Sequence, residues 1–110
     1  MSPLLYKIIF FGLLTVAVIL EVSADVIFKK WSLEHRSILF ALGLFIYLIG
    51  TIFWALSLKY DYLSKAGVIF TVFDLIAIVL AGVIVFKEDL SWINKAGIGF
   101  GILSIILIEL

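Results

Sequence analysis

The sequence predicts an all-α integral membrane protein with four transmembrane helices, and three observations lead to this fold class. First, 65% of the 110 residues are hydrophobic and only 15% are charged. Soluble domains average about 45–50% apolar residues and about 25% charged residues. Second, charged residues divide the chain into four apolar runs, each close to the roughly 17–25 residues with which a helix crosses a ~30 Å hydrocarbon core. Third, no run alternates apolar and polar residues, as the strands of a membrane barrel do.

The four apolar runs are bounded by charged residues, and each run is expected to form one helix. The first run ends at Lys29 and Lys30, and the third ends at a charged triplet that begins with Lys87. The first run is not expected to be a cleaved signal peptide, because Glu21 and Asp25 interrupt it. The predicted spans of this single domain, residues 1–110, are 4–28, 37–58, 63–86 and 93–110.

The composition excludes several classes of function. Eight Lys and Arg balance eight Asp and Glu, so the chain has no basic surface for nucleic acid. Cysteine is absent, which excludes disulfides and thiolate metal sites. No set of a nucleophile and a base and no cluster of metal ligands stands out, so we expect no enzymatic activity, no metal and no cofactor.

Lysine and arginine are distributed almost evenly between the two sides of the membrane. One side carries the terminal amine with Lys7, Lys59 and Lys65. The other side carries Lys29, Lys30, Arg36, Lys87 and Lys95. Because the Lys/Arg bias sets the orientation of a membrane protein, so small a bias predicts that chains insert in both orientations. No internal repeat is evident, so a transport pathway with two symmetric halves would require two chains.

Three acidic residues, Glu21, Asp25 and Asp74, fall inside the predicted spans. An ionisable group near the bilayer centre costs at least ~2.5–3.5 kcal/mol, so each of them marks a candidate site. Glu21 and Asp25 are four residues apart and share one helical face, where Ala17 and Ala24 are expected to leave room for a bulky group. Carboxylates held together in a low dielectric bind a proton or an organic cation but not comfortably both. That competition is the minimal chemistry of an antiporter.

Structural roles are open alternatives for two of these carboxylates. Asp25 lies one helical turn from Lys29, so the two side chains would form an ion pair near the membrane surface. Asp74 would accept a hydrogen bond from Thr71 or from a neighbouring helix.

The second span carries Tyr47, Thr51 and Trp54 on one helical face. Aromatic rings of this kind line cation sites through their negative faces, although ordinary packing is the alternative for Trp54. A phenol near the midplane needs a hydrogen-bond partner, and a carboxylate is the obvious one for Tyr47.

The last span contains a G-x-x-x-G spacing formed by Gly97 and Gly101, with Gly99 between them. Small residues allow helices to approach closely, so this span is expected to pack against another helix and to contribute to a dimer interface.

The segment Ala17-Val-Ile-Leu-Glu21 has the pattern A-x-x-x-E and is followed eight residues later by Lys29. Together with four short spans and a nearly absent charge bias, this segment resembles the small multidrug resistance family of the drug/metabolite transporter superfamily. The resemblance extends without gaps to the C-terminus, and Tyr47 falls where the family has its second-span tyrosine.

The resemblance implies an antiparallel homodimer with a shared central chamber, located in the inner membrane of a prokaryote. The two copies of Glu21 would bind protons and a cationic substrate in turn, with Tyr47 beside them. Phe70 stands where the family's third-span tryptophan stacks on the substrate. The family's dimerisation helix corresponds to the span that holds Gly97, Gly99 and Gly101.

The third span departs from the family pattern. The W-x-G-x-G kink of the family is here Phe70-Thr-Val-Phe-Asp74, so the bending that gates the chamber would come from elsewhere or be absent. The added carboxylates of Asp25 and Asp74 would give a dimeric chamber up to six carboxylates. This charge favours a polyvalent cation, such as a polyamine, over a bulky apolar monocation.

These observations favour a proton-coupled antiporter that exports small organic cations of the quaternary ammonium, guanidinium or polyamine type by alternating access. Two alternatives remain. A subunit of a flippase for lipid-linked sugars would need basic residues to meet phosphate, where this chain has acids. A non-transporting four-span scaffold or heterodimer partner would use the carboxylates only to hold helices together.

Overall fold

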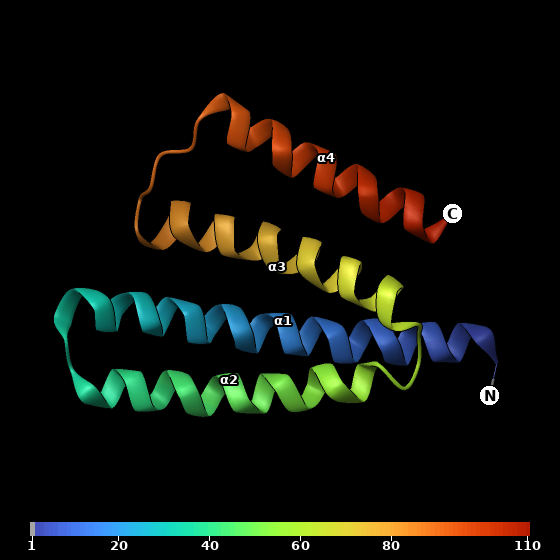
Figure 1. Cartoon of the computed structure of the whole chain (residues 1–110), viewed down its shortest axis with the longest axis horizontal. Coiled ribbons are helices and arrows are strands. Elements are labelled where there is room, and N and C mark those ends of the chain that lie inside the picture. Colours follow the sequence, from blue (N-terminus) through green and yellow to red (C-terminus); the bar gives the residue numbers. More distant parts are fainter. Residues whose placement is uncertain (1) are drawn as a thin grey trace.

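The computed structural model describes residues 2–110, and these residues form four helices joined by short connections (Figure 1). Each helix is long and apolar enough to cross a membrane, and residues 2–110 contain no strand. The predicted fold class is therefore confirmed. The helices are α1 (Pro3–Glu34), α2 (Ser37–Ser57), α3 (Leu63–Val85) and α4 (Trp92–Glu109).

Helix α1 is longer than the apolar run from which it was predicted. It begins after Ser2, whose hydroxyl accepts a hydrogen bond from the backbone N–H of Leu5 at 3.1 Å. It continues beyond Phe28 and ends where His35 adopts a left-handed conformation (φ 58°) and donates its N–H to the carbonyl of Trp31. A helix ends where its backbone is capped and not where hydropathy changes. With 32 residues, α1 is about 48 Å long, so its ends extend beyond the ~30 Å hydrocarbon core.

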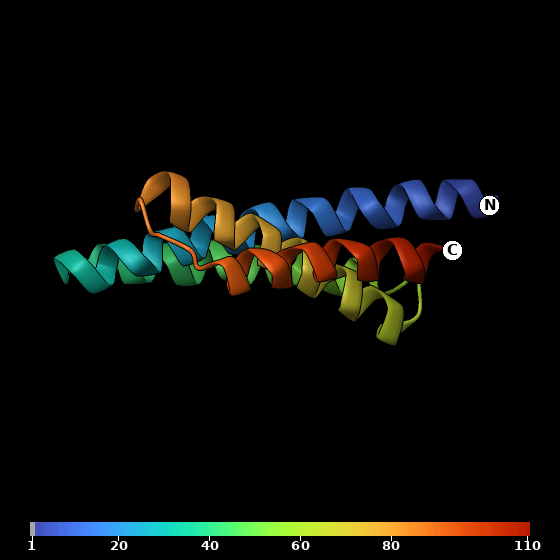
Figure 2. The same cartoon turned by 90° about the horizontal axis from the view of Figure 1, so that it is seen from above.

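The helices lie in the spatial order α2, α1, α3, α4, with α1 between α2 and α3 (Figures 1 and 2). The largest contact is between α1 and α2, which are antiparallel, whereas α1 and α3 run in the same direction. The small buried core joins α1 and α3, and its members are Phe10, Leu14, Val18, Ala66 and Ile69.

Two glycines of α2 allow it to lie close against α1. A Cβ atom at Gly50 would lie 3.1 Å from Cγ of Glu21 and 3.4 Å from the carbonyl oxygen of Ala17. A Cβ atom at Gly43 would lie 2.7 Å from the ring of Phe28. The expectation that Ala17 and Ala24 leave room for a bulky group is wrong within the chain, because both alanines are fully buried. Small side chains here let the helices approach and do not create a cavity.

Helix α4 lies at the edge of the fold against α3 and has no buried residue. A Cβ atom at Gly101 would lie 3.4 Å from the side chain of Val72, whereas Gly97 and Gly99 have no atom within 4 Å of that position. The end of α4 is held by Glu109, whose carboxylate oxygens lie 3.3 Å from Nζ of Lys7 and 3.6 Å from Nζ of Lys65.

Candidate functional site

The candidate site lies at the middle of the helices, where three spans each contribute a polar side chain. Tyr47 and Asp74 are the central residues of α2 and α3. Glu21 of α1 is buried, with 9% of its surface exposed, and lies against Gly50 of α2. Tyr47 precedes Gly50 by about one turn of α2. Glu21, which lies against Gly50, is therefore about one turn away from Tyr47 along the helix axis.

The three predicted carboxylates lie near enough to one another to interact electrostatically. Glu21 interacts electrostatically with both Asp74 and Asp25, and Asp25 also interacts with Asp74. The phenol of Tyr47 also interacts electrostatically with all three carboxylates, and its strongest interaction is with Glu21. Such interactions are stronger in a hydrocarbon surrounding than in water, because the dielectric constant there is low.

Within residues 2–110 none of these three carboxylates forms an ion pair. The ion pairs in this part of the chain are those of Glu109 and involve neither Glu21, Asp25 nor Asp74. Oxygen Oδ1 of Asp74 is shielded from solvent and accepts no hydrogen bond from a described residue. A buried polar atom without a partner is energetically costly, and a proton, a ligand or a second chain that reached this oxygen would reduce that cost.

The described part of the chain contains neither an ion pair between Asp25 and Lys29 nor a hydrogen bond from Thr71 to Asp74. Asp25 and Lys29 do not lie within ion-pairing distance, since the ion pairs of residues 2–110 involve other side chains. The hydroxyl of Thr71 donates to the carbonyl of Gly67 at 2.7 Å and not to Asp74.

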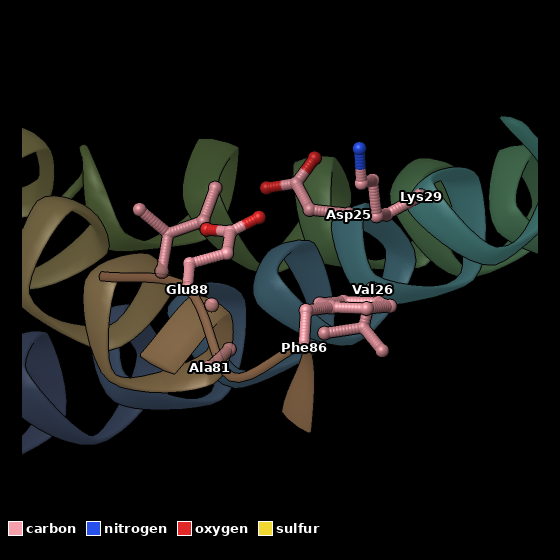
Figure 3. A pocket seen from close by; sticks show the side chains of 8 residues that line it. Asp25, Val26, Lys29, Ala81, Phe86 and Glu88 are labelled. Atoms are coloured by element: carbon pink, nitrogen blue, oxygen red, sulfur yellow. The ribbon is translucent and has the colours of Figure 1, made fainter. Parts of the chain in front are cut away.

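Asp25 faces a pocket of about 190 Å³ between α1 and the end of α3 (Figure 3). Its wall includes Lys29, Gly82, Phe86 and Glu88. Figure 3 shows the carboxylates of Asp25 and Glu88 near each other in this view, with the amino group of Lys29 on the other side of Asp25 and not within ion-pairing distance of it.

Glu88 is a candidate site residue that the sequence reasoning did not single out. After α3 ends, Lys87 adopts a left-handed conformation (φ 55°) and the N–H of Glu88 donates to the carbonyl of Gly82 at 3.2 Å. This turn folds the side chain of Glu88 back over Gly82, where a Cβ atom would lie 2.5 Å from Oε1. The charged triplet at the exit of the third span was the available signal, but the sequence alone suggested only a loop.

Phe70 lies on the opposite side of the carboxylates from this pocket. Its ring packs on Trp54 of α2 with centroids 4.6 Å apart. Phe70 precedes Asp74 by one helical turn, and Trp54 follows Gly50 by one turn, so this aromatic pair lies between the carboxylates and the connection 58–62. Thr51 contributes no contact to the carboxylates, because its hydroxyl donates to the carbonyl of Tyr47 at 2.9 Å.

The site is therefore arranged in layers along the helices. The Trp54–Phe70 pair lies toward one end, Glu21 and Asp74 lie at the centre, and Asp25 with its pocket lies toward the connection 86–91. No group of three or more His, Asp or Glu side chains in residues 2–110 is suited to hold a metal ion. Carboxylates and aromatic rings are groups that bind protons and organic cations.

The comparisons with known proteins give one match. The model of the EamA-like transporter family matches residues 2–110, which is nearly the whole chain. A search of curated proteins and a search of solved structures found no match. A multi-pass membrane protein with carboxylates inside its spans is consistent with this family, in which membrane transport is the shared activity. The chain belongs to the EamA-like transporter family and is a membrane transporter of the drug/metabolite superfamily.

Proposed function

We propose that the chain is a proton-coupled antiporter that exports small organic cations, with polyvalent amines as the preferred substrates. The observation that carries this proposal is the cluster of Glu21, Asp25 and Asp74, which has no positively charged partner within ion-pairing distance in residues 2–110. Carboxylates in a low-dielectric site must be neutralised either by protons or by a cation. A ligand that binds as a cation therefore expels protons, and protons expel the ligand.

The layered arrangement supports a site that is open toward one side at a time. Cations would arrive from the pocket of Asp25 and Glu88, whose negative charge attracts them. The aromatic rings of Trp54 and Phe70 would oppose passage to the other side and offer their faces to an ammonium or guanidinium group. The aromatic role implied for Phe70 by the resemblance is thus shared with Trp54.

The resemblance to the small multidrug resistance family further suggests an antiparallel homodimer in a prokaryotic inner membrane. Gly97 and Gly99 of α4 face open space in the single chain, so a second copy would find room to approach there. The dimer would bring two carboxylate clusters to one chamber, which favours substrates with more than one positive charge.

The experiment that tests the function is current recording on a solid-supported membrane. Purified protein is reconstituted into liposomes, and currents are measured on addition of spermidine, guanidinium or tetraethylammonium, with and without a pH gradient. We expect substrate-dependent currents, largest for spermidine, that the variant Glu21→Gln abolishes because glutamine keeps the shape of glutamate but cannot exchange a proton. The matched control is Glu34→Gln, which changes an exposed carboxylate at the end of the same helix.

Two results would contradict the proposal. Proton-coupled uphill export by the Glu21→Gln variant would assign the coupling to another group. Absence of any cation-induced current in the unmodified protein, while the liposomes hold a pH gradient, would exclude proton-coupled export of these cations.

A further inference from the structure

A second polar pocket lies at the end of the molecule where α1 begins, α2 connects to α3 and α4 ends (Figure 1). It has a volume of about 570 Å³. Three lysines and three tyrosines dominate its wall, which consists of Pro3, Tyr6, Lys7, Lys59, Tyr60, Asp61, Tyr62 and Lys65. None of these residues belongs to the carboxylate cluster at mid-membrane.

The charges around this pocket suit an anionic ligand with several oxygen atoms. The carboxylate of Glu109 already lies between Lys7 and Lys65, at 3.3 and 3.6 Å, so an anion with two oxygens fits between these ammonium groups. Lys59 forms no ion pair with any residue from 2 to 110. The nearby Asp61 accepts a hydrogen bond from the backbone N–H of Tyr62 at 2.8 Å and forms no ion pair with Lys59. Lys59 therefore offers the pocket a cation that the chain does not neutralise.

The position of the pocket places it at the level of the lipid headgroups. Its residues come from the first turns of α1 and α3 and from the connection 58–62, which are the ends of the membrane-spanning helices. Tyrosine is the side chain expected at this level, with its ring toward the acyl chains and its hydroxyl toward water. Tyr6 and Tyr60 pack edge to face with centroids 5.6 Å apart and form one wall.

We propose that this pocket binds the phosphate of an anionic phospholipid from the surrounding bilayer. The phosphate is held by Lys59 together with Lys7 and Lys65, in competition with the carboxylate of Glu109. The acyl chains lie along the lipid-exposed sides of α1 and α3. This site is separate from the transport chemistry proposed above, and its test does not depend on transport.

The test measures which lipids remain bound to the protein. The intact protein is purified in a mild detergent with equal amounts of phosphatidylglycerol and phosphatidylcholine, and bound lipid is identified by native mass spectrometry. We expect preferential retention of phosphatidylglycerol, because about 1 kcal/mol per lysine at an anionic surface corresponds to about fivefold in affinity. Lys59→Gln should reduce the retained phosphatidylglycerol by about fivefold, and Lys59→Arg should preserve it.

Two further variants make the test specific to this pocket. Glu109→Gln removes the competing carboxylate and should increase phosphatidylglycerol retention, which a purely structural role of Glu109 would not produce. Lys95→Gln is the matched control, since Lys95 lies in the first turn of α4 at the opposite end of the molecule, over the ring of Trp92. It should leave retention unchanged.

Three results would overturn the proposal. Equal retention of the two lipids would exclude an anionic headgroup site. Unchanged retention in Lys59→Gln would place the lipid elsewhere. Displacement of phosphatidylglycerol by inorganic phosphate at a similar concentration would show a site for soluble anions and not for a lipid.

Discussion

Gly50 is the position where a single added methyl group should disturb both the packing of α1 on α2 and the candidate site. In Gly50→Ala, the new Cβ would lie 3.1 Å from Cγ of Glu21 and 3.2 Å from Cβ of Leu20. Carbon atoms pack optimally at about 3.5–4.0 Å, so both contacts are too short. The two helices must separate slightly, or Glu21 must change its rotamer.

The magnitude of this effect follows from two opposing contributions. Replacing glycine by alanine inside a helix gains about 1 kcal/mol of helix propensity. Overpacking by one methyl group costs about 1–3 kcal/mol. The Gly50→Ala variant should therefore lose up to about 2 kcal/mol of stability. Gly12→Ala and Gly67→Ala are matched controls, because no atom lies within 4 Å of the added Cβ at either position, and they should gain up to about 1 kcal/mol.

The assay is equilibrium unfolding in mixed micelles of dodecyl maltoside and increasing sodium dodecyl sulfate, followed by circular dichroism. We expect Gly50→Ala to unfold at lower sodium dodecyl sulfate content than the unmodified chain, and the two control variants to unfold at equal or higher content. If all three alanine variants shift equally, the close approach of α2 to Glu21 does not exist in the folded protein, and the description of the site on that side is wrong.

Further predictions concern the carboxylate cluster and the orientation of the chain. Affinity for spermidine, measured by calorimetry, should rise with pH, because protons and the cation compete for the same carboxylates; a pH-independent affinity would contradict that competition. Asp74→Asn should weaken spermidine binding about tenfold, equivalent to about 1.4 kcal/mol, with a smaller loss for guanidinium. It should also lower the number of protons released, counted in two buffers of different ionisation enthalpy; an unchanged count would assign Asp74 a structural role. Ser2→Cys, labelled from outside intact cells, should react in about half of the molecules if both orientations occur; uniform labelling or uniform protection would refute dual topology.

Much of the fold could be predicted, because the number and length of the apolar runs determine the number of membrane-spanning helices. Four runs of sufficient length leave a membrane-embedded chain no alternative to helices, since every backbone group must be satisfied within its own segment. Helix α1 continues beyond the predicted span 4–28, because Lys29 and Lys30 mark the membrane surface and not a helix cap. The spatial order of the helices was not predictable, because apolar faces in a bilayer do not specify their neighbours.

Some residues of the candidate site could likewise be predicted from the sequence, and others could not. Glu21, Asp25 and Asp74 were detectable because a charge in hydrocarbon is costly wherever the helices lie. The roles of Ala17 and Gly50 depend on which helix lies opposite, and the role of Glu88 depends on how a turn folds back. Both are properties of the tertiary structure. The proposed lipid pocket is lined by two segments that are distant in the sequence, residues 3–7 and 59–65, and sequence patterns do not bring these together.

The connections between the helices restrict how the molecule can move. Only residues 35 and 36 separate α1 from α2, whereas residues 58–62 separate α2 from α3 and residues 86–91 separate α3 from α4. The contacts of Gly43 and Gly50 further fix α1 against α2, so these two helices form a stiff hairpin that cannot slide internally by a turn. Any large rearrangement must pivot this hairpin against α3 and α4 about the longer connections. Because Glu21 and Asp25 travel with the hairpin and Asp74 does not, such a pivot would change the spacing of the carboxylates, and with it their hold on protons and cations.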